Sequence, residues 1–232
     1  MSVKLEHVTI LAIGGGGGKI VKTVSHTYAA KWTQLAYLDT DVKDLDFVDG
    51  VLHVPMGEQW AREQGCGDDP ILGRRAAEAS LSAIREAIGN AELLIVVTCL
   101  GGGAGSGAAP VVARLAREMD ALTFFLVSLP LAGEGNGPRT IADQALEALR
   151  QDADTVIAVP NDLLFGHLPA NTPATRAFEM ANQVFADGLV GLAELVRCRG
   201  IISIDLSSLK TALKGRDHAI PTADTHFVNG KD

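Results

Sequence analysis

The feature of this 232-residue sequence that most constrains its fold is the glycine-rich segment 101–107, which reads Gly-Gly-Gly-Ala-Gly-Ser-Gly. An apolar run, 93–100, precedes it, and a segment with a helical pattern, 108–118, follows it. The order strand, glycine loop, helix brings main-chain N–H groups and the positive end of a helix dipole together, and this arrangement binds phosphate. A tight turn with a purely structural role is the alternative. We therefore predict a phosphate site here, with Pro110 in the first turn of the helix, where a proline lacks no needed N–H.

A second strand–glycine–helix junction lies near the N-terminus, where five glycines, 14–18, follow the apolar stretch 8–13. A P-loop would need glycine at Ile13 and serine or threonine at Ile20, so that motif fails. A dinucleotide fingerprint fails too, because Lys19 occupies the place of a small residue. Lys19 either reaches a phosphate or sugar as a point charge or faces solvent.

Alternating strand and helix patterns predict a doubly wound, Rossmann-like parallel sheet of the α/β class. The expected strands are 8–13, 35–38, 51–54, 93–100, 122–128 and 155–159, and the main expected helices are 71–87, 108–118, 140–150 and 175–196. We expect one domain over 1–200. A weaker strand-like and helical segment, 201–232, follows it.

Composition narrows the class of protein. Hydrophobic residues make up 47% and charged residues 21%, which is typical of a globular chain. A formal net charge of −8 argues against a nucleic-acid partner or an anionic membrane. Three cysteines without metal-like spacing, and no apolar stretch of the ~20 residues that a membrane span needs, favour a reduced, cytoplasmic setting.

Several motifs in order resemble one family. The segment 101–107 is similar to the tubulin signature Gly-Gly-Gly-Thr-Gly-Thr-Gly, and its continuation to 112 resembles bacterial FtsZ more than eukaryotic tubulin. The similarity extends from about 8 to 210. Further matching segments are 12–19, 39–41, 66–70 and 160–162.

This resemblance implies a GTPase domain that binds GTP or GDP, with Mg²⁺ as a candidate companion, followed by a long core helix and a second domain that is missing or truncated here. It implies that Glu134 and Arg139 lie on the ribose side, although one residue is inserted between them. Asn161 and Asn182 would bind the guanine edge, and Phe178 would stack on it, although taken alone this ring reads as core. The implied nucleotide-binding residues are Gly14, Gly15, Gly16, Lys19, Asp41, Gly67, Asp68, Gly101, Gly102, Gly103, Ala104, Gly105, Ser106, Gly107, Glu134, Arg139, Asn161, Phe178 and Asn182. We expect a side chain at Gly105 to fill the phosphate's place.

The resemblance also implies head-to-tail self-association, in which a loop of one subunit completes the hydrolytic site of the next. In FtsZ this loop reads Asn-x-Asp-x-x-Asp, whereas here Ser203 and Ser208 flank the retained Asp205. Asp205 is the implied catalytic residue, or else a helix N-cap. A serine is a far weaker base than a carboxylate, so we expect slow GTP hydrolysis. The alternative function is a nucleotide-gated scaffold without hydrolysis or conventional filaments.

Overall fold

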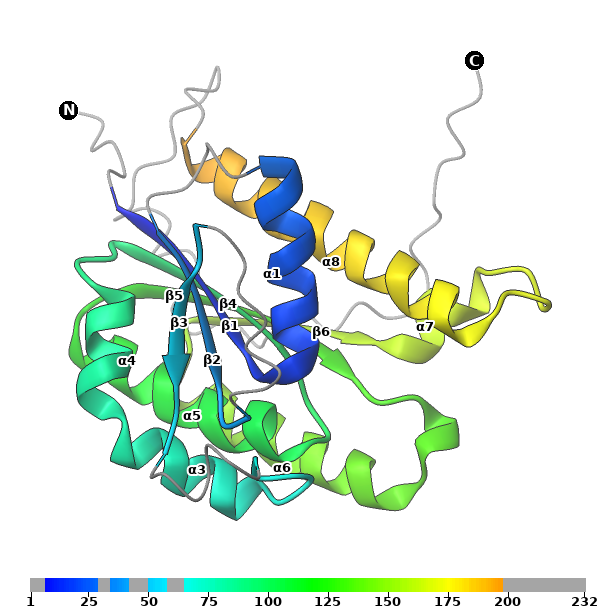
Figure 1. The fold of residues 1–232 in the computed structure, drawn as a ribbon, viewed down its shortest axis with the longest axis horizontal. Coiled ribbons are helices and arrows are strands. Elements are labelled where there is room, and N and C mark those ends of the chain that lie inside the picture. The colour runs from blue at the N-terminus through cyan, green and yellow to red at the C-terminus, as the bar shows by residue number, and fades with distance from the viewer. Residues whose placement is uncertain (1–6, 29–33, 42–49, 58–64, 198–232) are drawn as a thin grey trace.

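Six parallel strands form the central sheet, in the spatial order β3-β2-β1-β4-β5-β6 (Figure 1). The computed structural model describes residues 7–28, 34–41, 50–57 and 65–197. The strands are β1 (Val8–Ile13), β2 (Gln34–Asp39), β3 (Leu52–Pro55), β4 (Leu93–Cys99), β5 (Leu122–Leu129) and β6 (Thr155–Pro160). They confirm the predicted strands and the doubly wound α/β class, whereas the expected segment 201–232 lies outside the described residues.

The chain order reverses between β1 and β4, which pair side by side in parallel register, with Ile13 opposite Thr98. To one side the sheet continues through β2 and β3, and to the other through β5 and β6. In open sheets of this kind, the connections leave the two central strands in opposite directions, and a crevice opens beyond their carboxyl ends. The topology therefore places a ligand crevice after Ile13 and Cys99.

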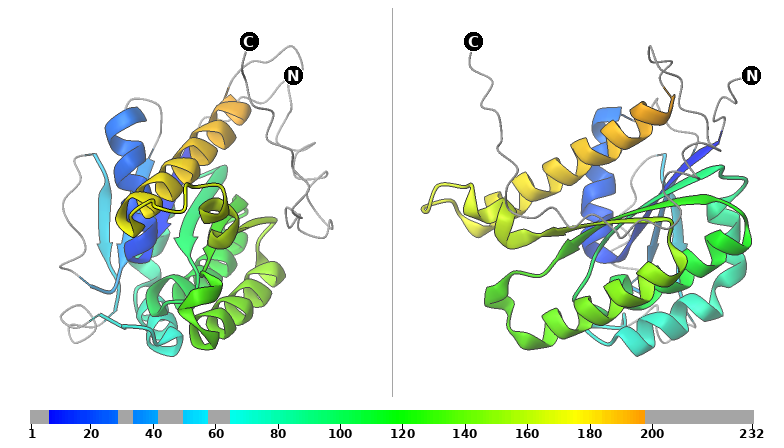
Figure 2. Two further views of the ribbon diagram at one scale, coloured as in Figure 1. Left: turned by 90° about the vertical axis from the view of Figure 1, so that its right-hand side faces the viewer. Right: turned by 180° about the vertical axis from the view of Figure 1, so that it is seen from behind.

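Helices cover both faces of the sheet (Figures 1 and 2). The side chains of β1 alternate between the two layers: Leu11 and Ile13 pack into the core under α3 to α6, and Ile10 and Ala12 into the core under α1 and α8. Among the described residues, no helix is long and apolar enough to cross a membrane. The helices are α1 (Gly14–Tyr28), α3 (Pro70–Ala79), α4 (Leu81–Ile88), α5 (Gly103–Glu118), α6 (Asn136–Asp152), α7 (Asn161–Gly166) and α8 (Ala174–Arg197), with a 3-10 turn at Ala132–Glu134.

The single helix expected over 71–87 is two helices, which meet at Ser80. Asp69 caps the first one, and its carboxylate accepts hydrogen bonds from the N–H groups of Ile71 (2.8 Å) and Leu72 (3.3 Å). The Ser80 hydroxyl accepts a hydrogen bond from the N–H of Gly57 at 2.8 Å, which ties the break to the loop after β3. A short helix, α7, was not predicted.

The first glycine run, and the second from Gly103 onward, are helical, which corrects the prediction that they are loops. Helix α1 begins at Gly14 and α5 at Gly103. Pro110 consequently lies inside α5 and not in its first turn. Glycine is a poor helix former, so tertiary packing must stabilise these first turns.

That packing is visible where α3 crosses α5. A Cβ atom added to Gly73 would meet the carbonyl group of Gly103, and one added to Gly107 would meet the backbone of Pro70 and Arg74. The two helices thus approach backbone to backbone at their glycines. A larger residue at either place would force the helices apart, since backbone cannot move aside as a flexible side chain can.

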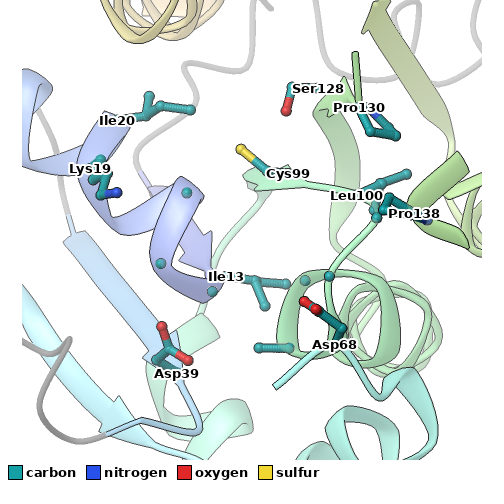
Figure 3. A pocket seen from close by; sticks show the side chains of 18 of the residues that line it. Ile13, Lys19, Ile20, Asp39, Asp68, Cys99, Leu100, Ser128, Pro130 and Pro138 are labelled. Atoms are coloured by element: carbon teal, nitrogen blue, oxygen red, sulfur yellow. The ribbon is translucent and has the colours of Figure 1, made fainter. Parts of the chain in front are cut away.

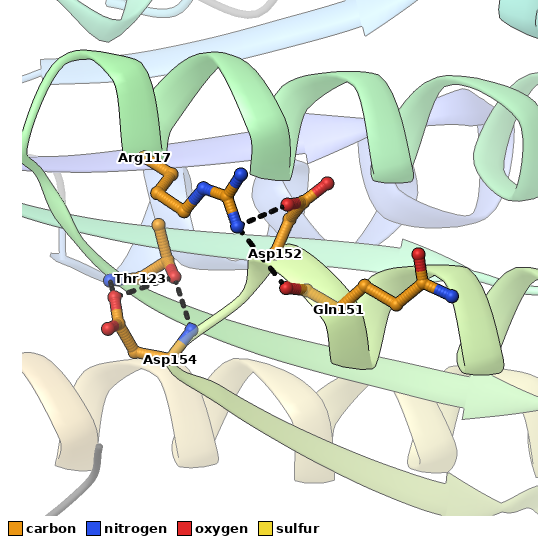
Figure 4. A network of polar contacts seen from close by, with 5 residues as sticks. All are labelled: Arg117, Thr123, Gln151, Asp152 and Asp154. Carbon is orange, nitrogen blue, oxygen red and sulfur yellow. Dashed lines mark hydrogen bonds and ion pairs between the residues drawn. The ribbon is translucent and has the colours of Figure 1, made fainter. Parts of the chain in front are cut away.

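A polar network ties the opposite edge of the sheet, away from the crevice (Figure 4). The Asp154 carboxylate accepts hydrogen bonds from the N–H (2.9 Å) and the hydroxyl (3.0 Å) of Thr123. Arg117, near the end of α5, pairs with Asp152 at 2.7 Å and donates to the carbonyl of Gln151 at 3.4 Å. These contacts fix the amino ends of β5 and β6 and leave their carboxyl ends to the site.

We expect Gly73→Ala to destabilise the protein by about 1–3 kcal/mol, because its methyl group would press on the backbone of α5. Gly191→Ala is the matched control within α8, where an added Cβ would meet nothing within 4 Å. It should stabilise by roughly 0.5–1 kcal/mol through helix propensity alone. Urea unfolding of both variants measures the difference, and equal effects of the two substitutions would contradict the close-packing explanation.

Candidate functional site

A cleft of about 760 Å³ opens at the carboxyl edge of the sheet, where the topology places it. The loops after β1, β2, β4 and β5 line it, together with the starts of α1 and α5 and one face of α8. In Figure 3, Ile13 lies at the centre, Lys19 on α1 to one side, and Pro130 and Pro138 on the other. This volume lies within the range of about 300–1,000 Å³ that small-molecule sites occupy.

Two helix N-termini meet in the cleft. The turns that lead into them need glycine, because Gly14 has φ 73° and Gly101 has φ 112°. A Cβ added to Gly14 would lie 3.2 Å from the backbone nitrogen of Gly105, so the first turns of α1 and α5 lie against each other. Their unpaired N–H groups and dipoles create a positive potential without a charged side chain. Such a place suits an anion.

At three glycines of the first run, a side chain would point into the protein, although one of them, Gly16, also lines the cleft. An added Cβ would meet the Cys99 side chain at Gly16 and the Tyr37 ring at Gly18, and it would lie 2.7 Å from the Val97 carbonyl oxygen at Gly17. Helix α1 therefore lies directly on β2 and β4. Its glycines permit this close approach.

Gly105 requires a correction. An added Cβ would meet the carbonyl oxygen of Cys99 and lie 2.5 Å from the Thr98 hydroxyl, so this position faces β4 and not the phosphate's place. Gly102 does face the cleft: only Asp68, at 3.9 Å, lies within 4 Å of an added Cβ. The backbone of Gly102 is extended, with φ −100° and ψ −178°, which any residue adopts.

Three of the expected residues do not line the cleft: Ser106, Gly107 and Arg139. The buried Ser106 hydroxyl accepts a hydrogen bond from the N–H of Gly101 at 2.8 Å and thereby closes the glycine turn. Gly107 packs on α3. The other expected residues of the described chain line the cleft, and Asp205 lies outside the described residues.

An aromatic and amide group lies on the α7 and α8 side of the cleft. Phe178 is 44% exposed, and its ring contacts Phe165 edge to face with centroids 5.0 Å apart. Asn182, one turn further along α8, and Asn161, at the start of α7, also line the cleft and are partly buried. An exposed aromatic face beside two amides can stack on a planar heterocycle and hydrogen-bond its edge.

The loop after β2 adds a buried carboxylate that is held in place. Asp39 is 3% exposed and accepts hydrogen bonds from the hydroxyl of Tyr37 (2.7 Å) and from the N–H of Thr40 (2.6 Å). The Thr40 hydroxyl in turn donates to the sulfur of Cys66 at 3.2 Å. These bonds connect β2 to the loop before α3 and hold Asp41 at the edge of the cleft.

The loop after β5 separates the expected pair Glu134 and Arg139. Glu134 lines the cleft, and its carboxylate accepts a hydrogen bond from the N–H of Leu131 at 2.8 Å. Helix α6 has already begun at Asn136, so Pro138 faces the cleft while Arg139, the next residue, is exposed outside it. The guanidinium of Arg139 therefore does not line the cleft in this chain.

Two cysteines line the cleft that the sequence analysis did not assign to it. Burial raises the pKa of the Cys66 thiol, and the hydrogen bond with Thr40 opposes this shift only in part. Burial also raises the pKa of Cys99, partly opposed by a hydrogen bond with Ser128 and by the charge of Lys19. Both thiols are therefore protonated at neutral pH.

Asp39 and Thr40 also line the cleft, as the polar end of their strand had indicated. Other lining residues were missed. Ile13, Leu100, Ser128 and Pro130 could have been indicated by their positions at strand ends, whereas Ile20, Gly65, Pro138, Ala181 and Phe185 lie elsewhere. Within the described ranges, no three histidine, cysteine, aspartate or glutamate side chains gather as a metal site.

This fold and site define a class: a doubly wound α/β protein that binds an anionic, heterocyclic ligand such as a nucleotide at the switch point of its sheet. The GTPase domain of the tubulin/FtsZ family matches residues 7–169. The chain belongs to the tubulin/FtsZ family.

Its relatives support this assignment. The chain is 36% identical over 208 residues to the cell division protein FtsZ of Haloferax mediterranei, covering 90% of this chain and 55% of the relative. It superposes on an empty FtsZ dimer of M. jannaschii with a TM-score of 0.84 at 31% identity, covering 91% of this chain and 61% of that one. A GTPγS-bound protofilament of CetZ2 from Haloferax volcanii gives a TM-score of 0.75 at 26% identity, with 84% and 60% covered. These relatives are archaeal FtsZ and CetZ proteins. They support membership of the tubulin/FtsZ family, and they do not support the narrower expectation of a bacterial FtsZ. The chain spans little more than half the length of the Haloferax mediterranei relative.

We expect Gly102→Val and Gly105→Val to fail in different ways. Gly102→Val should leave the unfolding temperature close to that of the parent, yet weaken binding of a phosphate-bearing ligand at least tenfold, because its side chain would occupy the cleft. Gly105→Val should destabilise the protein by about 3 kcal/mol or more through its clash with β4. Thermal unfolding combined with titration of a fluorescent nucleotide separates the two. A stable Gly105→Val protein with selective loss of binding would restore the original expectation.

Proposed function

We propose that this chain binds GTP and GDP in the cleft, associates head to tail, and hydrolyses GTP slowly. The observation that carries the proposal is the pairing, in one cleft, of two glycine-rich helix starts with an aromatic–amide group on α7 and α8. The first end suits phosphates and the second suits a base. Membership of a GTPase family supports the choice of nucleotide.

At the base end, Phe178 would stack on the guanine, and Asn161 and Asn182 would bind its edge. An amide both donates and accepts, so it matches the neighbouring carbonyl and N–H groups of guanine. The donor and the acceptor of an amide can also pair with adenine. Selectivity for guanine over adenine therefore depends on how the protein holds the two amides.

At the phosphate end, the N–H groups of the first turns of α1 and α5 would hold the phosphate oxygens. The open face of Gly102 leaves room for them. Glu134 would bind the ribose, and Asp41 would contact the nucleotide at the edge of the cleft. Mg²⁺ would bind through phosphate oxygens and waters, with one or two carboxylates at most.

Self-association and hydrolysis rest on relatives and on the sequence. One similar structure is an FtsZ dimer, and another is a protofilament of CetZ2 with GTPγS. In such an assembly Asp205 would approach the neighbour's nucleotide and position the attacking water, without the second carboxylate that Ser208 replaces. Cys66 and Cys99 are free thiols, which fits a reduced, cytoplasmic setting. A role in cell division is suggested by the name of the Haloferax mediterranei relative.

Ser208 also favours a second candidate function, in which the chain binds nucleotide as a scaffold and does not turn it over. Both functions share the cleft. They differ in whether GTP is consumed and whether assembly follows GTP.

We expect Asn182→Ala to weaken the preference for GTP over ATP by ~1–3 kcal/mol, because a buried donor or acceptor of the base loses its partner. Gln183→Ala is the matched control, since Gln183 is the next residue of α8, lies outside the cleft and donates to Asp187 at 2.8 Å. Competition titrations with both nucleotides measure the preference. An unchanged preference in Asn182→Ala would count against the base end assigned here.

Phosphate release with Mg²⁺ at high protein concentration should be ~10²–10⁴-fold slower than for an FtsZ that has both aspartates. Ser208→Asp should raise it and Asp205→Asn should lower it further. Sedimentation with GTP, GDP and a non-hydrolysable analogue shows whether assembly follows the nucleotide. Binding without pelleting or turnover would favour the scaffold, and turnover like that of the two-aspartate FtsZ would refute slow hydrolysis.

A further inference from the structure

We propose that Lys19 compensates the phosphate charge of the bound nucleotide in this chain, and that Arg139 does not. This assignment rests on the proposed function and names the side chain that makes the site accept a polyanion. It starts from the charges around the cleft. Among the described residues that line it, Lys19 is the single cation, and four carboxylates, those of Asp39, Asp41, Asp68 and Glu134, line it too.

The acidic lining makes a cation important. A nucleotide triphosphate brings several negative charges close to these carboxylates, and repulsion at such distances weakens binding unless a positive charge is near. The helix N-termini contribute only partial charges. One ammonium group at the rim therefore changes the balance of the site more than it would in a neutral cleft.

Arg139 is poorly placed for this task. Successive residues of a helix point about 100° apart, and on α6 it is Pro138 that faces the cleft. A Cβ at Gly101 would contact Pro138, with the Pro138 carbonyl oxygen 3.3 Å away, so this part of α6 is packed against the glycine turn. Arg139 is exposed on the next face. Rotation of α6 to bring the guanidinium inward would move Pro138 away from the lining of the cleft.

Lys19 is well placed. It lies in the second turn of α1, and Gly15 and Gly16, one turn earlier on the same face, line the cleft as well. Figure 3 shows its side chain at the cleft, on α1. Lys19 is exposed and forms no ion pair with the residues that the structure describes, so its ammonium group is available to a ligand. Its charge is felt inside the cleft, since it acts on the Cys99 thiol.

The length and flexibility of the lysine side chain suit this role. Its four-carbon stem can follow the cleft wall and place the ammonium over a range of positions. A flexible point charge can follow phosphate oxygens in both the diphosphate and triphosphate states. We therefore expect the ammonium to discriminate by ligand charge and not by the base.

The test compares GTP, GDP and guanosine binding to four proteins by calorimetry at two salt concentrations: the parent, Lys19→Gln, Lys19→Arg and Lys22→Gln. Lys22 is the matched control, because it is an exposed lysine of the same helix that does not line the cleft. Lys19→Gln should weaken GTP binding about ten- to hundredfold, the size expected for a lost charge-assisted hydrogen bond, and flatten its salt dependence. Guanosine binding should stay within about twofold, Lys19→Arg should restore GTP binding, and Lys22→Gln should match the parent.

Three results would overturn the assignment. The assignment would fail if Lys19→Gln bound GTP as tightly as the parent protein. It would also fail if Lys19→Gln weakened guanosine binding as much as GTP binding, because Lys19 would then contact the sugar or the base. A loss of GTP binding in Arg139→Gln that exceeds the loss in Lys19→Gln would return the role to the arginine. If the parent protein binds neither GTP nor guanosine, the proposed function itself fails, which distinguishes that outcome from a failure of Lys19 alone.

Discussion

The close approach of two glycine-rich helix starts to β4 and to α3 is the constraint on which the rest of this structure depends. Helix α1 lies on β4 through Gly16 and Gly17, and α5 lies on α3 through Gly103 and Gly107. In each case a single Cβ would meet backbone or a packed side chain. This contact brings both N-termini to the switch point of the sheet, and it thereby creates the cleft. The same residues that allow the packing also leave unpaired N–H groups there.

In a cleft built in this way, backbone N–H groups and helix dipoles provide the positive potential that suits an anion. The side chains of the lining can therefore have other roles. Asp39 accepts hydrogen bonds from Tyr37 and Thr40, and these bonds hold the start of the loop after β2. The carboxylate of Glu134 holds the loop after β5 in the same manner. Carboxylates at a phosphate site would oppose binding if they acted by charge alone, but here they also organise the loops that surround it. The balance of charge then depends on few cations.

The strands and the switch point could be predicted from the sequence, because buried parallel strands appear as continuous apolar runs between breaker residues. The helical state of the glycine runs could not, since glycine signals a turn and here tertiary contacts override its weak helix propensity. The predicted position of Pro110 was wrong for the same reason, because we predicted that the helix begins after the glycines, whereas α5 begins at Gly103. For the site, motif positions identified Phe178, Asn182 and most of the backbone contacts with the cleft. Gly105 was assigned to the ligand because sequence does not show which way a missing Cβ points.

The pair Glu134 and Arg139 shows that the presence of two residue types in a motif does not place both of them in a site. Successive residues of a helix point about 100° apart. In α6, Pro138 lines the cleft and Arg139 does not. A proline carries no charge, so under the proposed assignment the cation at this site is Lys19, which lines the cleft from α1. The position of Arg139 outside the lining and that of Lys19 within it therefore have to be tested together.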